Sequence, residues 1–209
     1  MTRALLAGLL AASVLCGCKI VQKAPGAGAG AAAPADMVGQ VVADTYEARL
    51  LPHVAQGAVD ARELTAAIGQ GLDAAGEALG ARAAGGGAWN FLAKGEGTVV
   101  GADRESRAAV LEVDLDGDRA ADLQIQLGPV VKGTALRDAS PFYVFTDFKD
   151  QIEFAALARA LNARATEALA LPEGDLLGKR VAFEGAFALR SGSDPIQVVP
   201  TRLALEDAP

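Results

Sequence analysis

The second half of the sequence alternates apolar and polar residues with a period of two. Segments with this pattern or a related strand signal lie at residues 98–102, 109–115, 121–127, 181–189 and 199–205. Because successive side chains of a β-strand point to opposite faces, the pattern predicts strands with one buried face. Pro200 indicates an edge or a bulge within the last of them.

A different period separates the third strand from the fourth. Apolar residues between positions 148 and 169 recur every three or four residues in an alanine-rich context, which predicts a helix. The order β-β-β-α-β-β is that of the OB-fold, a small five-stranded barrel. The sequence therefore predicts an α+β fold with an antiparallel OB-like barrel at residues 89–209. The alternative is an open antiparallel sheet with the helix packed on it. Residues 128–146 fit less well, because they resemble additional strand.

Residues 36–88 are expected to be helical. Asp36 is a candidate N-cap, and Pro52 is expected to end the first helix. Asp60 and Glu63 form a capping box that predicts a second helix. Three glycines at 85–87 close the region.

The amino-terminal residues indicate where in the cell the protein is located. Arg3 is followed by about a dozen apolar residues, which is the length of a signal-peptide core and too short for a membrane span. The segment at 15–18, Leu-Cys-Gly-Cys, resembles the bacterial lipobox, and it implies cleavage after residue 17. Cys18 would then carry diacylglycerol, and an acyl chain such as palmitate would be attached to the new amino terminus. The alternative is an ordinary secretory peptide in which the cysteines occur by chance.

Lipidation of Cys18 implies a protein held at the periplasmic side of a membrane. Residues 1–17 are then the signal peptide, and 18–35 are the lipidated cysteine and an Ala/Gly/Pro tether. Several acyl chains anchor a protein stably. Lys19 leaves the choice between inner and outer membrane open.

Composition excludes several functions. The chain has 19 basic and 26 acidic residues, a net charge of −7, which argues against nucleic acid as a partner. One His and two Cys are too few for a zinc site or a disulfide scaffold. No serine lies in a Gly-x-Ser-x-Gly elbow, so the sequence predicts a protein that is not an enzyme. A hydrolase with a carboxylate pair is a remote alternative.

An acidic run at 114–122 is a candidate calcium site. Four carboxylates stand at positions 1, 3, 5 and 9 of this run: Asp114, Asp116, Asp118 and Asp122. Calcium prefers oxygen ligands supplied at alternate positions of a short loop. Arg119 and Ile125 depart from the EF-hand pattern, and Asp-Gly is also a strong signal for a hairpin turn. A turn without a cation is therefore the alternative.

Two other pairs are candidate ligand-binding residues. Trp89 and Asn90, expected in a loop, could stack on a sugar ring and bond its hydroxyl groups. Arg137 and Asp138 could present a guanidinium and a carboxylate to a polar ligand or a partner. The alternatives are packing between two regions for Trp89 and an internal ion pair for Arg137.

The chain resembles a family of bacterial periplasmic lipoproteins known as domain of unknown function 2291. The resemblance covers nearly the whole mature chain, and its motifs lie at residues 18–21, 89–91, 95–100, 114–118, 133–138, 148–152, 178–179 and 185–187. It implies a periplasmic lipoprotein that occurs alongside ABC transporters for simple sugars. The first functional hypothesis is therefore a non-catalytic, membrane-anchored accessory to such a transporter. The alternative is a module that binds a small molecule, either a sugar or calcium.

Overall fold

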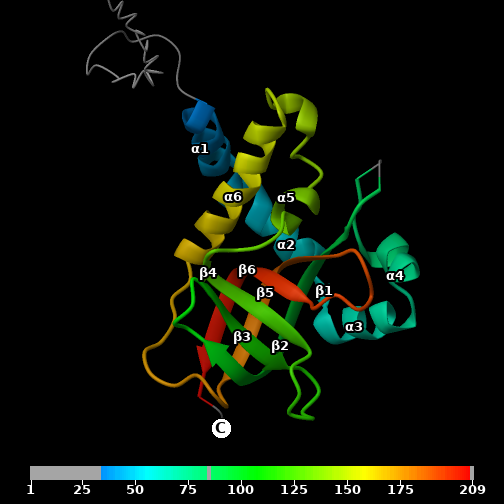
Figure 1. The fold of residues 1–209 in the computed structure, drawn as a ribbon, viewed down its shortest axis with the longest axis vertical. Coiled ribbons are helices and arrows are strands. Elements are labelled where there is room, and N and C mark those ends of the chain that lie inside the picture. The colour runs from blue at the N-terminus through cyan, green and yellow to red at the C-terminus, as the bar shows by residue number, and fades with distance from the viewer. Residues whose placement is uncertain (1–33, 84–85, 208–209) are drawn as a thin grey trace, which may run out of the picture. The chain divides into compact units, whose positions relative to one another are not determined.

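The computed structural model describes residues 34–83 and 86–207. These described residues form one compact unit, in which helices cover part of a β-barrel (Figure 1). The helical elements are α1 (Pro34–Thr45), the π-helical turn η1 (Tyr46–Leu50), α2 (Leu51–Gly57), α3 (Ala61–Gln70), α4 (Leu72–Leu79), α5 (Ala135–Asp138), the 3-10 turn η2 (Phe145–Asp147) and α6 (Gln151–Glu167). The strands are β1 (Val59–Asp60), β2 (Trp89–Asp103), β3 (Ala108–Asp114), β4 (Leu123–Pro129), β5 (Arg180–Leu189) and β6 (Gln197–Glu206).

The longest strands of the described chain close into a barrel of five, in the order β2-β3-β4-β6-β5, with β5 pairing back to β2. The OB-like arrangement is therefore confirmed, and the open sheet is wrong. The expectation of an entirely antiparallel barrel needs one correction, because β4 and β6 are parallel. Strand direction cannot alternate all the way around a ring with an odd number of strands, so one neighbouring pair must be parallel.

Strand β2 is shared between two neighbours. Its first part, Trp89 to Thr98, pairs with β5, and its last part, from Thr98 onward, pairs with β3. Gly97 lies at this change of partner. A Cβ atom there would meet the carbonyl oxygen of Asp114 at 2.4 Å, so the two strands approach this closely only because residue 97 is glycine.

The bulge expected near Pro200 is confirmed, since the register of β5 and β6 shifts where Gly185 faces Pro200. The bulge also reverses the side-chain faces of β6. Val199 packs in the outer core, whereas Leu203 and Leu205 pack against the barrel interior. The sequence pattern had placed these three residues on one face.

Pro52 does not end the first helix, which is a second correction. The chain continues helically from α1 through η1 to the end of α2 at Gly57. The amide of Leu51 donates to the carbonyl of Tyr46, five residues earlier. This wider turn lies directly before Pro52, the kind of local adjustment that accompanies a proline within a helix.

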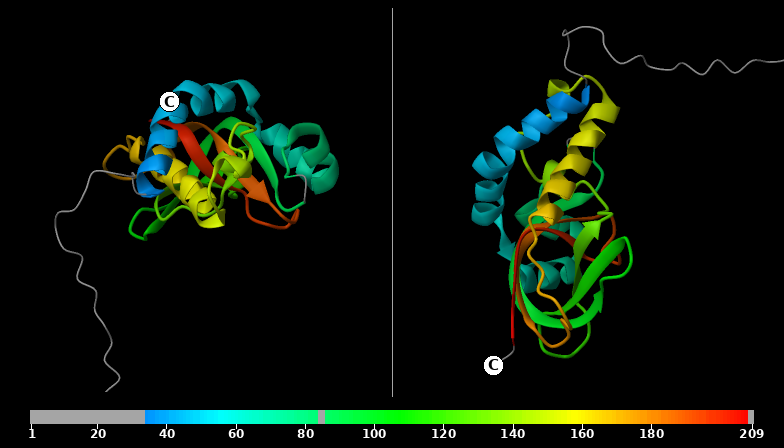
Figure 2. Two further views of the ribbon diagram at one scale, coloured as in Figure 1. Left: turned by 90° about the horizontal axis from the view of Figure 1, so that it is seen from above. Right: turned by 90° about the vertical axis from the view of Figure 1, so that its left-hand side faces the viewer.

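Two apolar cores hold the unit together. The first fills the barrel and includes Phe91 and Phe187, whose rings stack 5.2 Å apart, and it extends to α3 and α4. The second lies between the outer surface of the barrel and the helices α1, α2, α5 and α6 (Figure 2). Asp60 caps α3 as expected, because its carboxylate accepts the amide of Arg62 at 2.9 Å. The additional strand expected within 128–146 is wrong beyond Pro129, because that segment contains α5 and η2.

No helix in the described part of the chain is long and apolar enough to span a bilayer. The expected signal peptide, the lipidated Cys18 and most of the tether lie outside the described residues.

Candidate functional site

A groove with charged walls crosses the outer surface of β2, β5 and β6 beside α3. We call it the charged groove, and its central part has a volume of about 380 Å³. The residues that line this part are Asp60, Arg62, Lys94, Gly95, Glu96, Ala182, Phe183, Glu184 and Arg202. Gly95, which has no side chain, and Ala182 form the floor of the groove, whereas long charged side chains form its walls.

The charged walls follow from strand geometry. Lys94 and Glu96 occupy alternate outward positions of β2, and Glu184 and Arg202 occupy facing positions of β5 and β6. Farther along β5, Arg180 pairs with Glu96 at 3.0 Å, while Arg202 and Glu184 are 3.8 Å apart. Cations and carboxylates therefore alternate across the groove.

Arg62 is held in the groove by two hydrogen bonds to backbone carbonyls. It extends from α3, and its Nε donates to the carbonyl oxygen of Leu115 at 2.6 Å. Its Nη2 donates to the carbonyl of Glu96 at 3.3 Å. These bonds join α3 to the β3–β4 hairpin and to β2, so the wall of the groove is set by three elements.

The charged groove continues in two directions. Toward the β3–β4 hairpin it shares Arg62 and Glu96 with a hollow of about 480 Å³ that reaches Asp116. Toward α2 it shares Glu184 and Arg202 with a hollow of about 350 Å³ that is lined by Leu51, Pro52 and Ala55. The end toward the hairpin therefore carries both arginines and carboxylates, and the end toward α2 is mainly apolar.

The acidic run forms the hairpin between β3 and β4. Both oxygens of the buried Asp114 carboxylate accept backbone amides, from Asp116 at 3.0 Å, Gly117 at 2.6 Å and Arg119 at 2.8 Å. Asp122 accepts the amide of Leu115 at 2.7 Å. These amide dipoles stabilise the carboxylates that the turn brings together.

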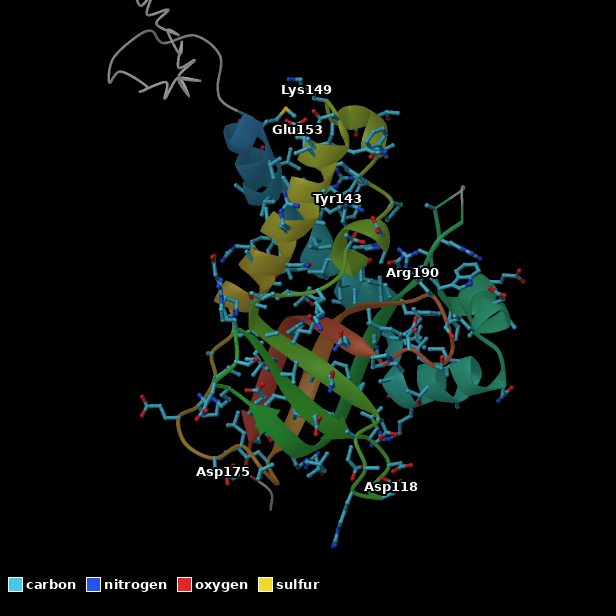
Figure 3. The ribbon with its side chains drawn as sticks, in the orientation of Figure 1. Asp118, Tyr143, Lys149, Glu153, Asp175 and Arg190 are labelled. Atoms are coloured by element: carbon cyan, nitrogen blue, oxygen red, sulfur yellow. The ribbon has the colours of Figure 1, made fainter. Side chains whose placement is uncertain are left out.

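Three of the four predicted calcium ligands are close enough to share an ion. Oxygen atoms of Asp114, Asp116 and Asp122 lie within 4.8 Å of one another. Asp118 is not a member of this group, and its carboxylate accepts the amide of Ala120 at 2.7 Å. Figure 3 shows Asp118 at the tip of the hairpin. Calcium at this loop stays a prediction.

The amides that surround Asp114, chiefly that of Gly117, hold the pKa of its carboxyl below the ordinary value. Since the pKa is depressed in the folded state, this group stabilises the fold above its unfolded pKa of about 4, and the stabilisation is lost as pH falls through the folded value. We expect Asp114→Asn to lower the urea midpoint at pH 7, and the difference from the wild type to shrink below about pH 4. Asp118→Asn removes the same charge from the same hairpin and is the control, with a smaller effect expected. A difference for Asp114→Asn that stays constant from pH 7 to 3 would contradict this assignment.

Trp89 and Asn90 begin β2 and do not lie in a loop, which corrects that expectation. The Trp89 ring packs so closely on α4 that a Cβ at Gly76 would meet it at 2.1 Å. Its Nε1 donates to Asp73 at 2.9 Å, and the Arg82 guanidinium lies 4.9 Å from the ring centroid. The buried Asn90 amide donates to two backbone carbonyls, of Ala81 and Ala88. These contacts favour packing of β2 on α4, and sugar binding here stays a prediction.

Arg137 and Asp138 form an ion pair in α5, with 2.7 Å between Nε and Oδ1. Arg137 also donates to the carbonyl of Phe154 at 2.9 Å and lies over the Phe154 ring at 3.8 Å. Asp138 accepts the hydroxyl of Thr134. The pair therefore joins α5 to α6, and this geometry favours the internal role over ligand binding.

The structure does not unite the predicted site residues. Trp89 lies at α4, Arg137 at α6 and the aspartates at the hairpin. The cations of the charged groove were missed, because Arg62 lies on α3 and the others lie on three different strands that are distant in the sequence. The signal was available in the alternation of Lys94 with Glu96, but only closure of the barrel shows which strands are neighbours.

The fold places this chain among OB-fold proteins. A crystal structure of an OB-fold protein from Thermotoga maritima is similar to it, with a TM-score of 0.63 and 18% sequence identity over 85% of this chain and 100% of that one. The sequence model of a family described as "predicted periplasmic lipoprotein (DUF2291)" matches residues 8–204, so the chain belongs to that family. It is accordingly a lipid-anchored periplasmic protein. No curated protein matches the sequence.

Proposed function

We propose that this lipoprotein is a non-catalytic accessory to a simple-sugar ABC transport system and contacts one of its components through the charged groove. The observation that supports the proposal is the set of three arginines, Arg62, Arg180 and Arg202, that line the charged groove and its extension toward the β3–β4 hairpin. Arginine is enriched among the residues that dominate protein interfaces. The apolar end of the groove at α2 adds the mixed character that such interfaces have.

The ion pairs of the groove are suited to an exchange of partners. The side chains of Arg180 and Glu96 are 53% and 64% exposed, and that of Arg202 is 77% exposed. Exposed pairs of this kind contribute about 0–1 kcal/mol, so little stability is lost when one member bonds another protein. Complementary charge on the partner would then provide orientation and specificity.

The test is co-purification of the tagged, lipidated full chain from membranes of its native host. We expect a permease, an ATPase subunit or a sugar-binding protein of the transport system to be retained. The double variant Arg180→Glu/Arg202→Glu is expected to reduce that retention at least fivefold. Arg107→Glu/Arg190→Glu makes the same change of charge at exposed positions outside the lining of the groove and is expected to leave retention unchanged. The proposal would be contradicted if no transport component is retained, or if the groove variant and the control variant retain it equally.

Calcium binding at the hairpin is the second candidate function. It is favoured by the proximity of the carboxylates of Asp114, Asp116 and Asp122, and Asp116 also borders the charged groove. The candidate requires a rise in Tm of the full chain with calcium relative to EGTA, and loss of that rise in Asp116→Asn. A ligand at a hundred times its Kd adds about 2.7 kcal/mol, so a flat result at millimolar calcium would remove this candidate.

A further inference from the structure

Large apolar side chains are exposed mainly at one end of the helical layer. In the described residues, four of the six most exposed belong to the first turn of α1, the first turn of α6 and the segment just before α6. These four, which we call the apolar end, are Met37, Val144, Phe145 and Ile152. Ile152, at 76%, is the most exposed of them.

A groove accompanies these side chains. It lies between α1 and α6, has a volume of about 590 Å³, and its apolar lining includes Val38, Ile152, Ala156 and Ala160. Small alanines on α6 leave the space open, and Ile152 stands at its edge. Exposed apolar side chains gathered at one end of a unit and accompanied by such a groove are typical of an interaction site.

The apolar end adjoins the place where the anchor joins the folded unit. Pro34 begins α1 and lies 16 residues after Cys18, the predicted lipid attachment site. A chain of that length reaches at most about 55 Å when extended and averages about 22 Å as an unstructured coil. The starts of α1 and α6 lie at the same end of the unit, near the labelled Lys149 and Glu153 (Figure 3). The bilayer is therefore the apolar medium within reach of this end.

We propose that the apolar end inserts into the interfacial region of the bilayer that holds the lipid on Cys18. The charges that line the groove between α1 and α6 are balanced, with Lys149 and Arg159 against Asp150 and Glu153. Insertion is therefore driven by apolar side chains and does not require anionic lipid. Lys149 and Arg159 can lay their apolar stems along the surface and keep their charges in water.

Insertion of the apolar end determines how the barrel is oriented relative to the membrane. Asp118 and Asp175 lie at the end of the unit opposite Lys149 (Figure 3). With the apolar end on the lipid, the barrel points away from the membrane and its outer surface is open to the periplasm. The inference rests on the lipid anchor and holds whether or not the charged groove binds a transporter.

The test uses the full lipidated chain in vesicles of phosphatidylcholine that contain nitroxide-labelled lipid. An environment-sensitive fluorophore is attached at Ile152→Cys, at Phe145→Cys or, as a matched control, at Leu177→Cys. Leu177 is also an exposed large apolar residue, at 55%, but it lies two residues from Asp175 at the opposite end. We expect at least twofold quenching at positions 152 and 145 and none at 177, with little dependence on salt.

A second variant separates insertion from mere proximity. Ile152→Asp is expected to abolish quenching of the fluorophore at 145 while the protein stays with the vesicles through its lipid, whereas Leu177→Asp leaves it unchanged. Equal quenching at all three positions, or quenching at none, overturns the proposal. Disulfide-linked dimers of Ile152→Cys without quenching also overturn it and assign the apolar end to a second copy of the chain.

Discussion

Replacing Cys18 with alanine is expected to abolish lipid attachment completely. The sulfur of Cys18 is the atom that would receive the diacylglyceryl group, and alanine offers no nucleophile in its place. Because cleavage after Gly17 follows lipid transfer in the lipobox scheme, the variant should also keep residues 1–17. Metabolic labelling with palmitate and the intact mass of the purified chain measure both effects.

Cys16→Ala is the matched control for this prediction. Cys16 lies two residues before Cys18, and its use would place the bulky Leu15 next to the cleavage site. We expect normal labelling and a mature chain that begins at residue 18. Acylated protein from Cys18→Ala, or loss of label in Cys16→Ala, would contradict the assignment of the anchor.

Barrel topology was accessible from the sequence because the period of the apolar residues changes with the type of element. Alternation at 181–189 and at 109–115 corresponds to β5 and β3, and the three-four repeat corresponds to α6. Predictions from the local sequence were wrong where an adjoining segment or a paired strand determines the conformation. Pro52 was expected to end a helix, but a π-helical turn directly before it accommodates the proline. Trp89 was expected in a loop, but pairing with Leu189 makes it the start of a strand.

Site prediction was weaker for a related reason. Residues with conspicuous chemistry, such as Trp89 and Arg137, make internal contacts that a sequence cannot display. The charged groove is built from unremarkable residues such as Lys94 and Arg202, which lie far apart in the chain. Their proximity depends on the closure of β2 on β5 and of β5 on β6, and only the folded barrel supplies it.

The helices relate the proposed anchor to the charged groove. A lipid on Cys18, as proposed, would limit how far the start of α1 can lie from the bilayer, and α1 packs beside α6, which carries Ile152. The second core then fixes these helices on β2, β5 and β6 through buried residues such as Leu92, Ala186 and Val199. The charged groove lies on the outer surface of the same strands, so its position relative to the apolar end is set by helix packing.

The barrel itself should be sensitive to substitution at Gly97, where β2 changes its partner strand. In Gly97→Ala the new methyl group would lie 2.4 Å from the carbonyl oxygen of Asp114 and 2.6 Å from a side-chain carbon of Val113. The first of these contacts is backbone within the β3–β4 hairpin, so it can yield only if β2 and β3 separate. Overpacking of this kind costs about 1–3 kcal/mol. We expect a value near the top of that range, which corresponds to a fall in Tm of roughly 6–10 °C for a unit of this size.

Gly39→Ala makes the same chemical change where space is free. Gly39 lies exposed in α1, and a Cβ there meets no atom within 4 Å. Alanine in a helix is more favourable than glycine by about 0.5–1 kcal/mol, so Tm should rise slightly. Opposite signs for the two variants in thermal and urea unfolding would tie the loss at Gly97 to the closure of the barrel. A Gly97→Ala chain as stable as the wild type would show that β2 and β3 tolerate a wider separation, and closure would then not depend on glycine at this position.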